Sequence, residues 1–127
     1  MKLVIGGRAQ GKLAYARKRY RLSEEAVWDG CLPDGSKTGG QTVVVNHVHL
    51  WVKKRILEQG NPEEEILAFL ESCPDCVIIG DEIGNGIIPT DAGEREYRER
   101  TGRIFIRLAE QAEEVTRVIC GIGQKIK

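Results

Sequence analysis

Four short apolar runs, separated by segments with helical features, constrain the fold of this chain more than any other feature of its sequence. The runs are rich in valine and isoleucine and occupy residues 2–5, 42–45, 76–79 and 115–120. Strands that are apolar on both faces are typical of parallel sheets, in which helices connect one strand to the next. The chain is therefore predicted to fold as an α/β domain with a mostly parallel sheet.

Helices are predicted between these strands, at residues 13–20, 49–59, 61–73 and 91–114. Asn61-Pro62, followed by three glutamates, is typical of a helix N-terminus, and Asp91 is expected to cap the last helix. The glycines and the proline of residues 21–40 predict a mobile loop, and residues 80–90 predict a second loop. Ligands of parallel sheets bind at the carboxyl ends of the strands. We expect residues from three such ends to meet at a site: 6–13, 46–49 and 81–86.

Composition limits the size and the partners of the domain. With 127 residues, of which 41% are hydrophobic and 30% charged, the chain fits one domain, residues 1–127. The 19 basic and 19 acidic side chains cancel, so no nucleic-acid partner is expected. The apolar runs are far shorter than the roughly 20 residues that span a bilayer, and no signal peptide is recognised. A cytoplasmic protein without a membrane partner is expected.

The cysteines offer one candidate site of a different kind. Cys73 and Cys76 have the C-x-x-C spacing of zinc and redox sites, but a structural zinc site usually needs a second pair, which the sequence lacks. We therefore expect ordinary reduced thiols, with a metal or redox role as the alternative.

A glycine-rich segment directly after the first apolar run matches the pattern G-x-x-x-x-G-K. It consists of Gly6, Gly7, Arg8, Ala9, Gln10, Gly11, Lys12 and Leu13. The glycines allow successive backbone N–H groups to point at an anion, and the lysine of such a loop reaches the β- and γ-phosphates of a nucleotide. The alternative is a glycine-rich turn with an exposed lysine, but the position between a strand and a helix favours phosphate binding.

The second half of the chain resembles one enzyme family. Residues 81–89, Asp-Glu-Ile-Gly-Asn-Gly-Ile-Ile-Pro, are similar to the Asn-Glu-Val-Gly-x-Gly-Ile-Val-Pro segment of adenosylcobinamide kinase/adenosylcobinamide-phosphate guanylyltransferases. The resemblance continues to Lys127 and is also strong over residues 1–16. The helix that follows the segment keeps, in the order of that family, Arg95, Arg98, Gly102, Arg103, Arg107 and Leu108.

This resemblance implies a P-loop NTPase with a RecA-like, three-layer α/β fold, usually assembled as a homotrimer. It implies GTP or ATP as nucleotide, Mg²⁺ as metal and a corrinoid as second substrate. Two reactions are implied at one nucleotide site. The first phosphorylates the aminopropanol hydroxyl of adenosylcobinamide, and the second transfers GMP from GTP to the product through a guanylylated histidine.

Three departures from the family pattern affect this chemistry. Leu13 stands where a Ser or Thr hydroxyl should hold Mg²⁺, and Asn46 stands where the strand of the family ends in an acid. The histidine-bearing segment of the family lies between the first helix and that strand, where this chain has only residues 21–40, without a histidine. Guanylyl transfer by the family route is therefore expected to be lost.

Other residues are candidates for the missing roles. Asp81 is expected as a substitute magnesium ligand, and Glu82 as the carboxylate that orients an attacking hydroxyl, with loop capping as the alternative for both. His47 and His49 are read as neighbours on one face of a strand, where a histidine acts as a base or accepts a phosphoryl group. An ordinary hydrogen-bonded role is the favoured reading of both.

The long helix near the C-terminus offers two more features. Arg95 and Arg98 suit phosphate binding, with salt bridges to the neighbouring glutamates of the helix, Glu94, Glu96 and Glu99, as the alternative. Phe105 and Ile106, hydrophobic where the family is polar, indicate either an altered subunit interface or a differently packed core.

Together these features predict a nucleotide-binding P-loop protein of this family, in which Lys12 and Glu82 catalyse phosphorylation of a corrinoid. The alternatives are a catalytically silent nucleotide-sensing or regulatory paralogue that binds a corrinoid enzyme, and a scaffold whose loop is a relic.

Overall fold

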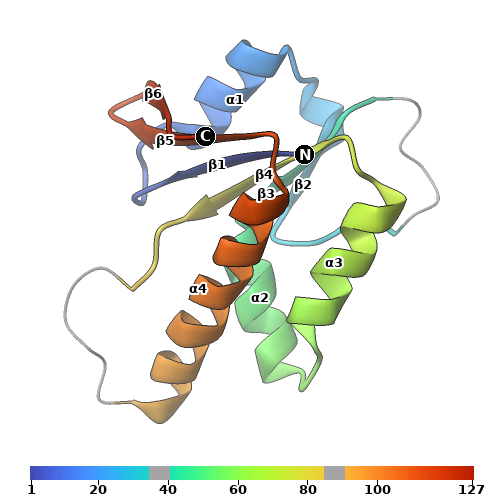
Figure 1. Ribbon diagram of the computed structural model, residues 1–127, viewed down its shortest axis with the longest axis vertical. Coiled ribbons are helices and arrows are strands. Elements are labelled where there is room, and N and C mark those ends of the chain that lie inside the picture. Colours follow the sequence, from blue (N-terminus) through green and yellow to red (C-terminus); the bar gives the residue numbers. More distant parts are fainter. Residues whose placement is uncertain (35–40, 85–90) are drawn as a thin grey trace.

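The computed structural model describes residues 1–34, 41–84 and 91–127. These residues form a sheet of six strands in the order β2-β3-β4-β1-β5-β6, with helices on both faces (Figure 1). The strands are β1 (Lys2–Gly6), β2 (Val27–Asp29), β3 (Val43–Asn46), β4 (Cys76–Asp81), β5 (Glu114–Ile119) and β6 (Ile122–Lys125). The helices are α1 (Lys12–Tyr20), the 3-10 helix η1 (Glu24–Ala26), α2 (Val48–Leu57), α3 (Pro62–Ser72) and α4 (Ala92–Gln111). All strand pairs except β5–β6 are parallel, so the predicted mostly parallel α/β fold is confirmed.

The sheet separates two hydrophobic cores, as its residue alternation requires. In β1, Leu3 packs into the core under α2, α3 and α4, whereas Val4 packs into the smaller core under α1. In β4, Ile78 packs into the larger core and Val77 into the smaller one. Figure 1 shows α1 on one side of the sheet and the other three α-helices on the opposite side. The result is the expected three-layer arrangement.

Helix α4 covers the larger core with a stripe of buried side chains at Tyr97, Thr101, Ile104 and Leu108, spaced as one face of a helix. The ring of Phe105 lies against β4 at Gly80, where a Cβ would be 2.6 Å from its Cζ atom. Phe105 therefore packs against the larger core, and an altered interface and a differently packed core both stay predictions. Its neighbour Ile106 is 61% exposed.

The prediction of one long loop at residues 21–40 is wrong for residues 24–29. Ser23 caps η1 by accepting a hydrogen bond from the Glu25 N–H, and β2 then pairs in parallel with β3. A strand of three residues has little signal of its own, because its stability comes from pairing with a distant segment. Residues 35–40 lie outside the described residues, as do residues 85–90 of the segment that resembles the family.

The C-terminus also differs from the prediction, because the strand after α4 ends at Ile119 and a second strand, β6, follows it. Cys120 and Gly121 have φ angles of 50° and 76°, so they form the two-residue turn of a β-hairpin.

The predicted helix starts are confirmed: Asn61 accepts a hydrogen bond from the Glu64 N–H, and Asp91 accepts one from the Gly93 N–H.

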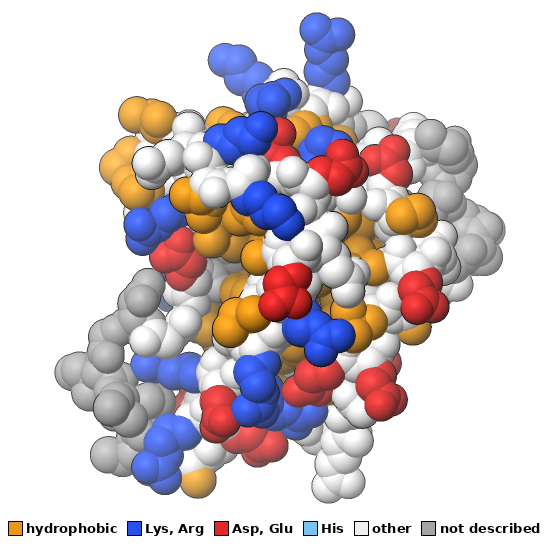
Figure 2. All heavy atoms as spheres, viewed as in Figure 1, with side chains coloured by type: hydrophobic (Ala, Val, Ile, Leu, Met, Phe, Trp, Pro, Cys, Tyr) orange, Lys and Arg blue, Asp and Glu red, His pale blue; other side chains and the backbone are white. Residues whose placement is uncertain are grey.

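Acidic and basic side chains alternate over the visible face of the molecule (Figure 2). On α4, Arg100 pairs with Glu63 of α3 at 2.8 Å, and Arg103 pairs with Glu99 at 2.7 Å. Both pairs lie on the surface at α4, and a phosphate-binding role of Arg95 and Arg98 stays a prediction. Within the part of the chain that the structure describes, the helices are too short or too polar to cross a bilayer.

Candidate functional site

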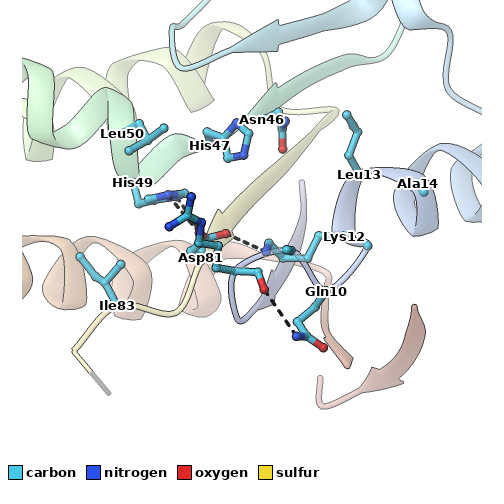
Figure 3. A pocket seen from close by; sticks show the side chains of 13 residues that line it. Gln10, Lys12, Leu13, Ala14, Asn46, His47, His49, Leu50, Asp81 and Ile83 are labelled. Carbon is cyan, nitrogen blue, oxygen red and sulfur yellow. Dashed lines mark hydrogen bonds and ion pairs between the residues drawn. The ribbon is translucent and has the colours of Figure 1, made fainter. Parts of the chain in front are cut away.

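The carboxyl ends of four neighbouring strands converge on one region of the sheet. In the order β2-β3-β4-β1, the strands end at Asp29, Asn46, Asp81 and Gly6. A cavity of about 710 Å³ opens at this edge (Figure 3). Its walls come from the glycine-rich loop, from the turn between β3 and α2, and from the end of β4; the lining residues are Arg8, Ala9, Gln10, Gly11, Lys12, Leu13, Ala14, Asn46, His47, His49, Leu50, Asp81 and Ile83.

Two glycines of the glycine-rich loop occupy positions with a structural requirement. Gly11 has a φ of 84° and directly precedes α1, so the loop ends at the positive end of a helix. Gly6 must be glycine, because a Cβ there would lie 2.5 Å from the Val118 carbonyl oxygen. Gln10 ties the loop to the β5–β6 turn by accepting the Cys120 N–H at its Oε1 atom and the Gly121 N–H at its carbonyl, both at 2.8 Å.

Lys12 is held inside this site rather than extended into solvent. Its Nζ atom donates to the Gly7 carbonyl at 2.6 Å and pairs with Asp81 Oδ1 at 2.7 Å. The side chains of Lys12 and Asp81 are only 7% and 15% exposed. The structure therefore brings together the lysine and the aspartate that the sequence named as separate candidates, and it cancels the charge of the lysine in doing so.

His49 completes a buried triad with this pair. Its Nδ1 atom accepts the backbone N–H of Asp81 at 3.0 Å, so the proton of the neutral ring is on Nε2, which lies 3.4 Å from Asp81 Oδ2. Burial lowers the pKa of His49 against the attraction of Asp81, and the positive charge of Lys12 acts in the same direction as burial. His49 is therefore a neutral hydrogen-bonding residue that positions Asp81.

Glu82 points elsewhere. Its carboxylate forms a two-point ion pair with Arg117 of β5, with Oε1 2.8 Å from Nε and Oε2 3.1 Å from Nη2. Glu82 is not among the residues that line the cavity, whereas Asp81 is. A catalytic role for Glu82 stays a prediction, and one that requires the Arg117 pair to open.

A second polar cluster lies at the ends of β2 and β3. Asn46 Nδ2 donates to Asp29 Oδ1 at 3.1 Å, and His47 Nδ1 lies 2.5 Å from the same oxygen. The sequence reading placed His47 and His49 on one face of a strand, and this is wrong. His47 is a single left-handed residue with a φ of 54°, and His49 is in the first turn of α2. Sequence reasoning missed Asp29, because the strand that positions it has no periodicity of its own.

The donors in the cavity do not fit the usual metal site of a P-loop. Mg²⁺ sites combine one or two carboxylates with phosphate oxygens and water. Here Leu13 has no oxygen on its side chain, and both oxygens of Asp81 already contact Lys12 or His49. Groups of three or more His, Cys, Asp or Glu side chains able to hold a metal are absent from the described residues. Asp81 as a magnesium ligand stays a prediction that requires Lys12 to move away.

A second cavity, of about 680 Å³, adjoins the first across the start of α1. It shares Gly11 and Ala14 with the first cavity and is otherwise lined by Tyr15, Lys18, Arg19, Arg21 and Gly121. The ring of Tyr15 packs on Gly123, where an added Cβ would overlap it. This groove is basic and has one aromatic wall.

The C-x-x-C pair has the surroundings of structural cysteines. Cys76 is buried at the start of β4, and burial raises its pKa to about 12. All four cysteines are free. Because metal ligands and redox nucleophiles are thiolates, a thiol that stays protonated at neutral pH favours the ordinary reading of this pair.

A glycine-rich loop between the first strand and the first helix of a parallel sheet, with its lysine in a cavity at the carboxyl ends of the strands, defines the P-loop NTPase class. Comparison with known proteins names the family. Residues 30–126 match the family model "Cobinamide kinase / cobinamide phosphate guanyltransferase", and the chain belongs to that family, as its sequence predicted.

Two curated relatives extend this comparison. The "Bifunctional adenosylcobalamin biosynthesis protein CobU" of Salmonella typhimurium is 39% identical over 69 residues, which are 51% of this chain and 38% of the relative. The protein of the same description from Escherichia coli is 39% identical over 67 residues, 50% of this chain and 37% of the relative. The aligned part of this chain thus spans well under half the length of these relatives.

Proposed function

We propose that this protein binds GTP or ATP in the cavity at the glycine-rich loop and transfers the terminal phosphoryl group to the hydroxyl of adenosylcobinamide. The observation that carries the proposal is the position of the Lys12 ammonium, inside a loop that ends at the N-terminus of α1. The backbone N–H groups of such a loop and a lysine together stabilise β- and γ-phosphates. Family membership supports the corrinoid as acceptor.

The nucleotide would occupy both cavities. Its phosphates lie at the loop, where they take over Lys12 from Asp81, and its nucleoside extends across Gly11 into the groove beside Tyr15. The aromatic ring and the arginines of that groove suit stacking against a base. Gly6 and Gly7 shape the loop from behind, since they are outside the cavity lining.

Guanylyl transfer through the histidine segment of the family is proposed to be lost, because residues 21–40 contain no histidine. A cytoplasmic location and a homo-oligomer, with the trimer of the family as the expected form, belong to the same proposal.

A second candidate function is a nucleotide sensor without catalysis. It is supported by Leu13, which removes the hydroxyl ligand of the usual metal site, and by Asn46, which replaces a carboxylate by a neutral amide. The Asp81 carboxylate, which opposes the charge of Lys12, supports it as well. The two functions differ in turnover and not in binding.

The first experiment is calorimetric titration of the protein with GTP and ATP, with and without Mg²⁺, followed by a phosphorylation assay on adenosylcobinamide. Lys12→Ala should weaken binding at least tenfold, since a charge-assisted contact to phosphate is worth about 1.5–3 kcal/mol. Lys54→Ala removes an exposed lysine on α2 and serves as the matched control. Equal nucleotide affinity of the Lys12→Ala variant and the wild type would refute nucleotide binding at this site. Nucleotide binding without phosphorylation of adenosylcobinamide would favour the sensor function.

A further inference from the structure

We propose that His47, held by Asp29, accepts the proton of the hydroxyl that attacks the terminal phosphate of the nucleotide. The inference rests on the proposed phosphoryl transfer and assigns a residue to one of its steps. It comes from the geometry of the turn between β3 and α2, which the sequence reading had not distinguished from an ordinary pair of surface histidines.

His47 connects the end of β3 to the start of α2 and brings its ring to the cavity. It is the single residue between β3 and α2, with a φ of 54°, and its side chain makes no capping hydrogen bond to the helix. Histidine is one of the residues that adopt left-handed backbone more readily than most, and here this conformation turns the chain between the strand and the helix. The ring lines the same cavity as Lys12 and Asp81 (Figure 3).

Its hydrogen bonds leave one nitrogen available as a base. The Asp29 carboxylate can only accept, so His47 donates its Nδ1–H to Oδ1, and the lone pair of the neutral ring is on Nε2. Asn46 Nδ2 lies 3.2 Å from the same Nδ1 and donates to the Asp29 oxygen at 3.1 Å, so Asp29 is the shared acceptor of both groups. A carboxylate that fixes the tautomer of a histidine and stabilises its protonated form is the general arrangement of a positioned base.

The other acceptors of the cavity are engaged. His49 has the opposite tautomer, with Nδ1 accepting the Asp81 N–H, although the two imidazole rings are only 5.7 Å apart. Asp81 contacts Lys12 and His49 with its two oxygens. The His47 side chain is 41% exposed and lines the cavity, and Nε2 is the ring nitrogen that Asp29 leaves unused.

The pair also gives a reason for the amide at position 46. An aspartate there would place its carboxylate where Asn46 Nδ2 now donates to Asp29, and two carboxylates at about 3 Å repel. Asn46 instead links Asp29 to the end of β3. Asn46 departs from the acidic pattern of the family, and the Asp29–His47 pair requires this departure.

One proton and one phosphoryl group move in the proposed step. The Nε2 lone pair takes the hydroxyl proton while the hydroxyl oxygen forms its bond to the γ-phosphorus. The bond between that phosphorus and the β–γ bridging oxygen breaks, and its electron pair leaves with the nucleoside diphosphate. The imidazolium that results is stabilised by Asp29 and releases its proton from Nε2 to solvent.

The test uses the full chain with GTP and adenosylcobinamide, and it measures GTP affinity separately from kcat and KM. We expect His47→Gln to lower kcat about 10²–10³-fold with GTP affinity unchanged, the usual effect of removing a positioned base. Asp29→Asn and Asn46→Asp should each lower kcat about tenfold, a smaller loss because Asp29 is 65% exposed and acts only through His47. Asp75→Asn, exposed at the opposite edge of the sheet, is the matched control and should leave all constants unchanged.

Chemical rescue separates a base from a structural residue. His47→Gly suits the left-handed backbone, so its fold should persist, and added imidazole should restore part of the lost kcat. A kcat of His47→Gln within twofold of wild type, or a lack of rescue by imidazole, would overturn this role of His47 alone. If the wild-type protein binds GTP but transfers no phosphoryl group, this role of His47 is also overturned and the sensor function remains. If the wild-type protein binds no GTP, the proposed function itself is refuted.

Discussion

Substituting Asp81 by asparagine should tighten nucleotide binding while it destabilises the free protein. The carboxylate of Asp81 lies 2.7 Å from Lys12 Nζ, and both side chains are largely buried. A nucleotide must therefore draw the ammonium away from Asp81 and place its own negative charge near that carboxylate. Asparagine keeps a hydrogen-bonding oxygen for Lys12 and removes the charge.

The magnitude follows from the electrostatics of the site. Two unit charges about 4 Å apart interact by about 4 kcal/mol at an effective dielectric constant of 20, and relaxation and solvent leave a fraction of this. We expect a net gain of about 1.5–3 kcal/mol in binding, which is about 10- to 150-fold in Kd. The free protein should lose up to about 3 kcal/mol of stability, because a buried lysine without a charged partner is costly.

The assay is calorimetric titration with GTP in the absence of Mg²⁺, combined with thermal denaturation of the free protein. Glu82→Gln is the matched control, since it makes the same chemical change on the next residue, outside the cavity, and should leave GTP affinity unchanged. An unchanged or weaker affinity of Asp81→Asn without Mg²⁺ would refute the reasoning. A loss confined to Mg²⁺-containing buffer would instead identify Asp81 as the metal ligand.

Single substitutions of Leu13, Tyr15 and His49 test three further features of the structure. Leu13→Ser should make GTP binding stronger in Mg²⁺ than without it, because it restores the hydroxyl that a P-loop uses for the metal; calorimetry that shows no Mg²⁺ dependence would contradict this. Tyr15→Ala should weaken GTP about fivefold or more and leave tripolyphosphate unaffected, since a stacked ring contributes about 1–3 kcal/mol; equal losses for both ligands would place the nucleoside elsewhere. The pKa of His49 is lowered from its ordinary 6.5, chiefly by burial, so the unfolded chain takes up a proton more readily than the folded one. Its contribution to the free energy of unfolding should therefore be complete above about pH 6.5 and decline as the pH falls below it; urea denaturation from pH 7.5 to 5 should show a shallower decline in His49→Asn than in wild type.

Much of the fold could be predicted because its signals are local. The apolar runs of β1, β3 and β4 are buried on both faces, and such strands need no distant partner to be recognised. Asn61 and Asp91 cap their helices through bonds that span two or three residues. The strands β2 and β6 could not be predicted in this way, since β2 depends on its pairing with β3 and β6 on a tight turn at Cys120.

In the candidate site, too, the local features could be predicted and the contacts between distant residues could not. The glycine-rich loop is contiguous, so its pattern was visible in residues 6–13, and the strand ends were expected to converge. The pairing of Lys12 with Asp81 joins residues far apart in the chain, as does the pairing of His47 with Asp29. Sequence spacing has no information on such contacts until the strand order is known.

The sequence by itself determined the class of this protein: a phosphate loop on a parallel sheet and membership of the cobinamide kinase family are properties of contiguous segments. Only the tertiary structure decided what surrounds the loop. The strand order β2-β3-β4-β1 places Asp29, Asn46 and Asp81 at one edge, and there it pairs the lysine with an aspartate and a histidine with a second aspartate. The reason is physical, because hydrogen bonds and ion pairs act over about 3 Å in space and are indifferent to separation along the chain.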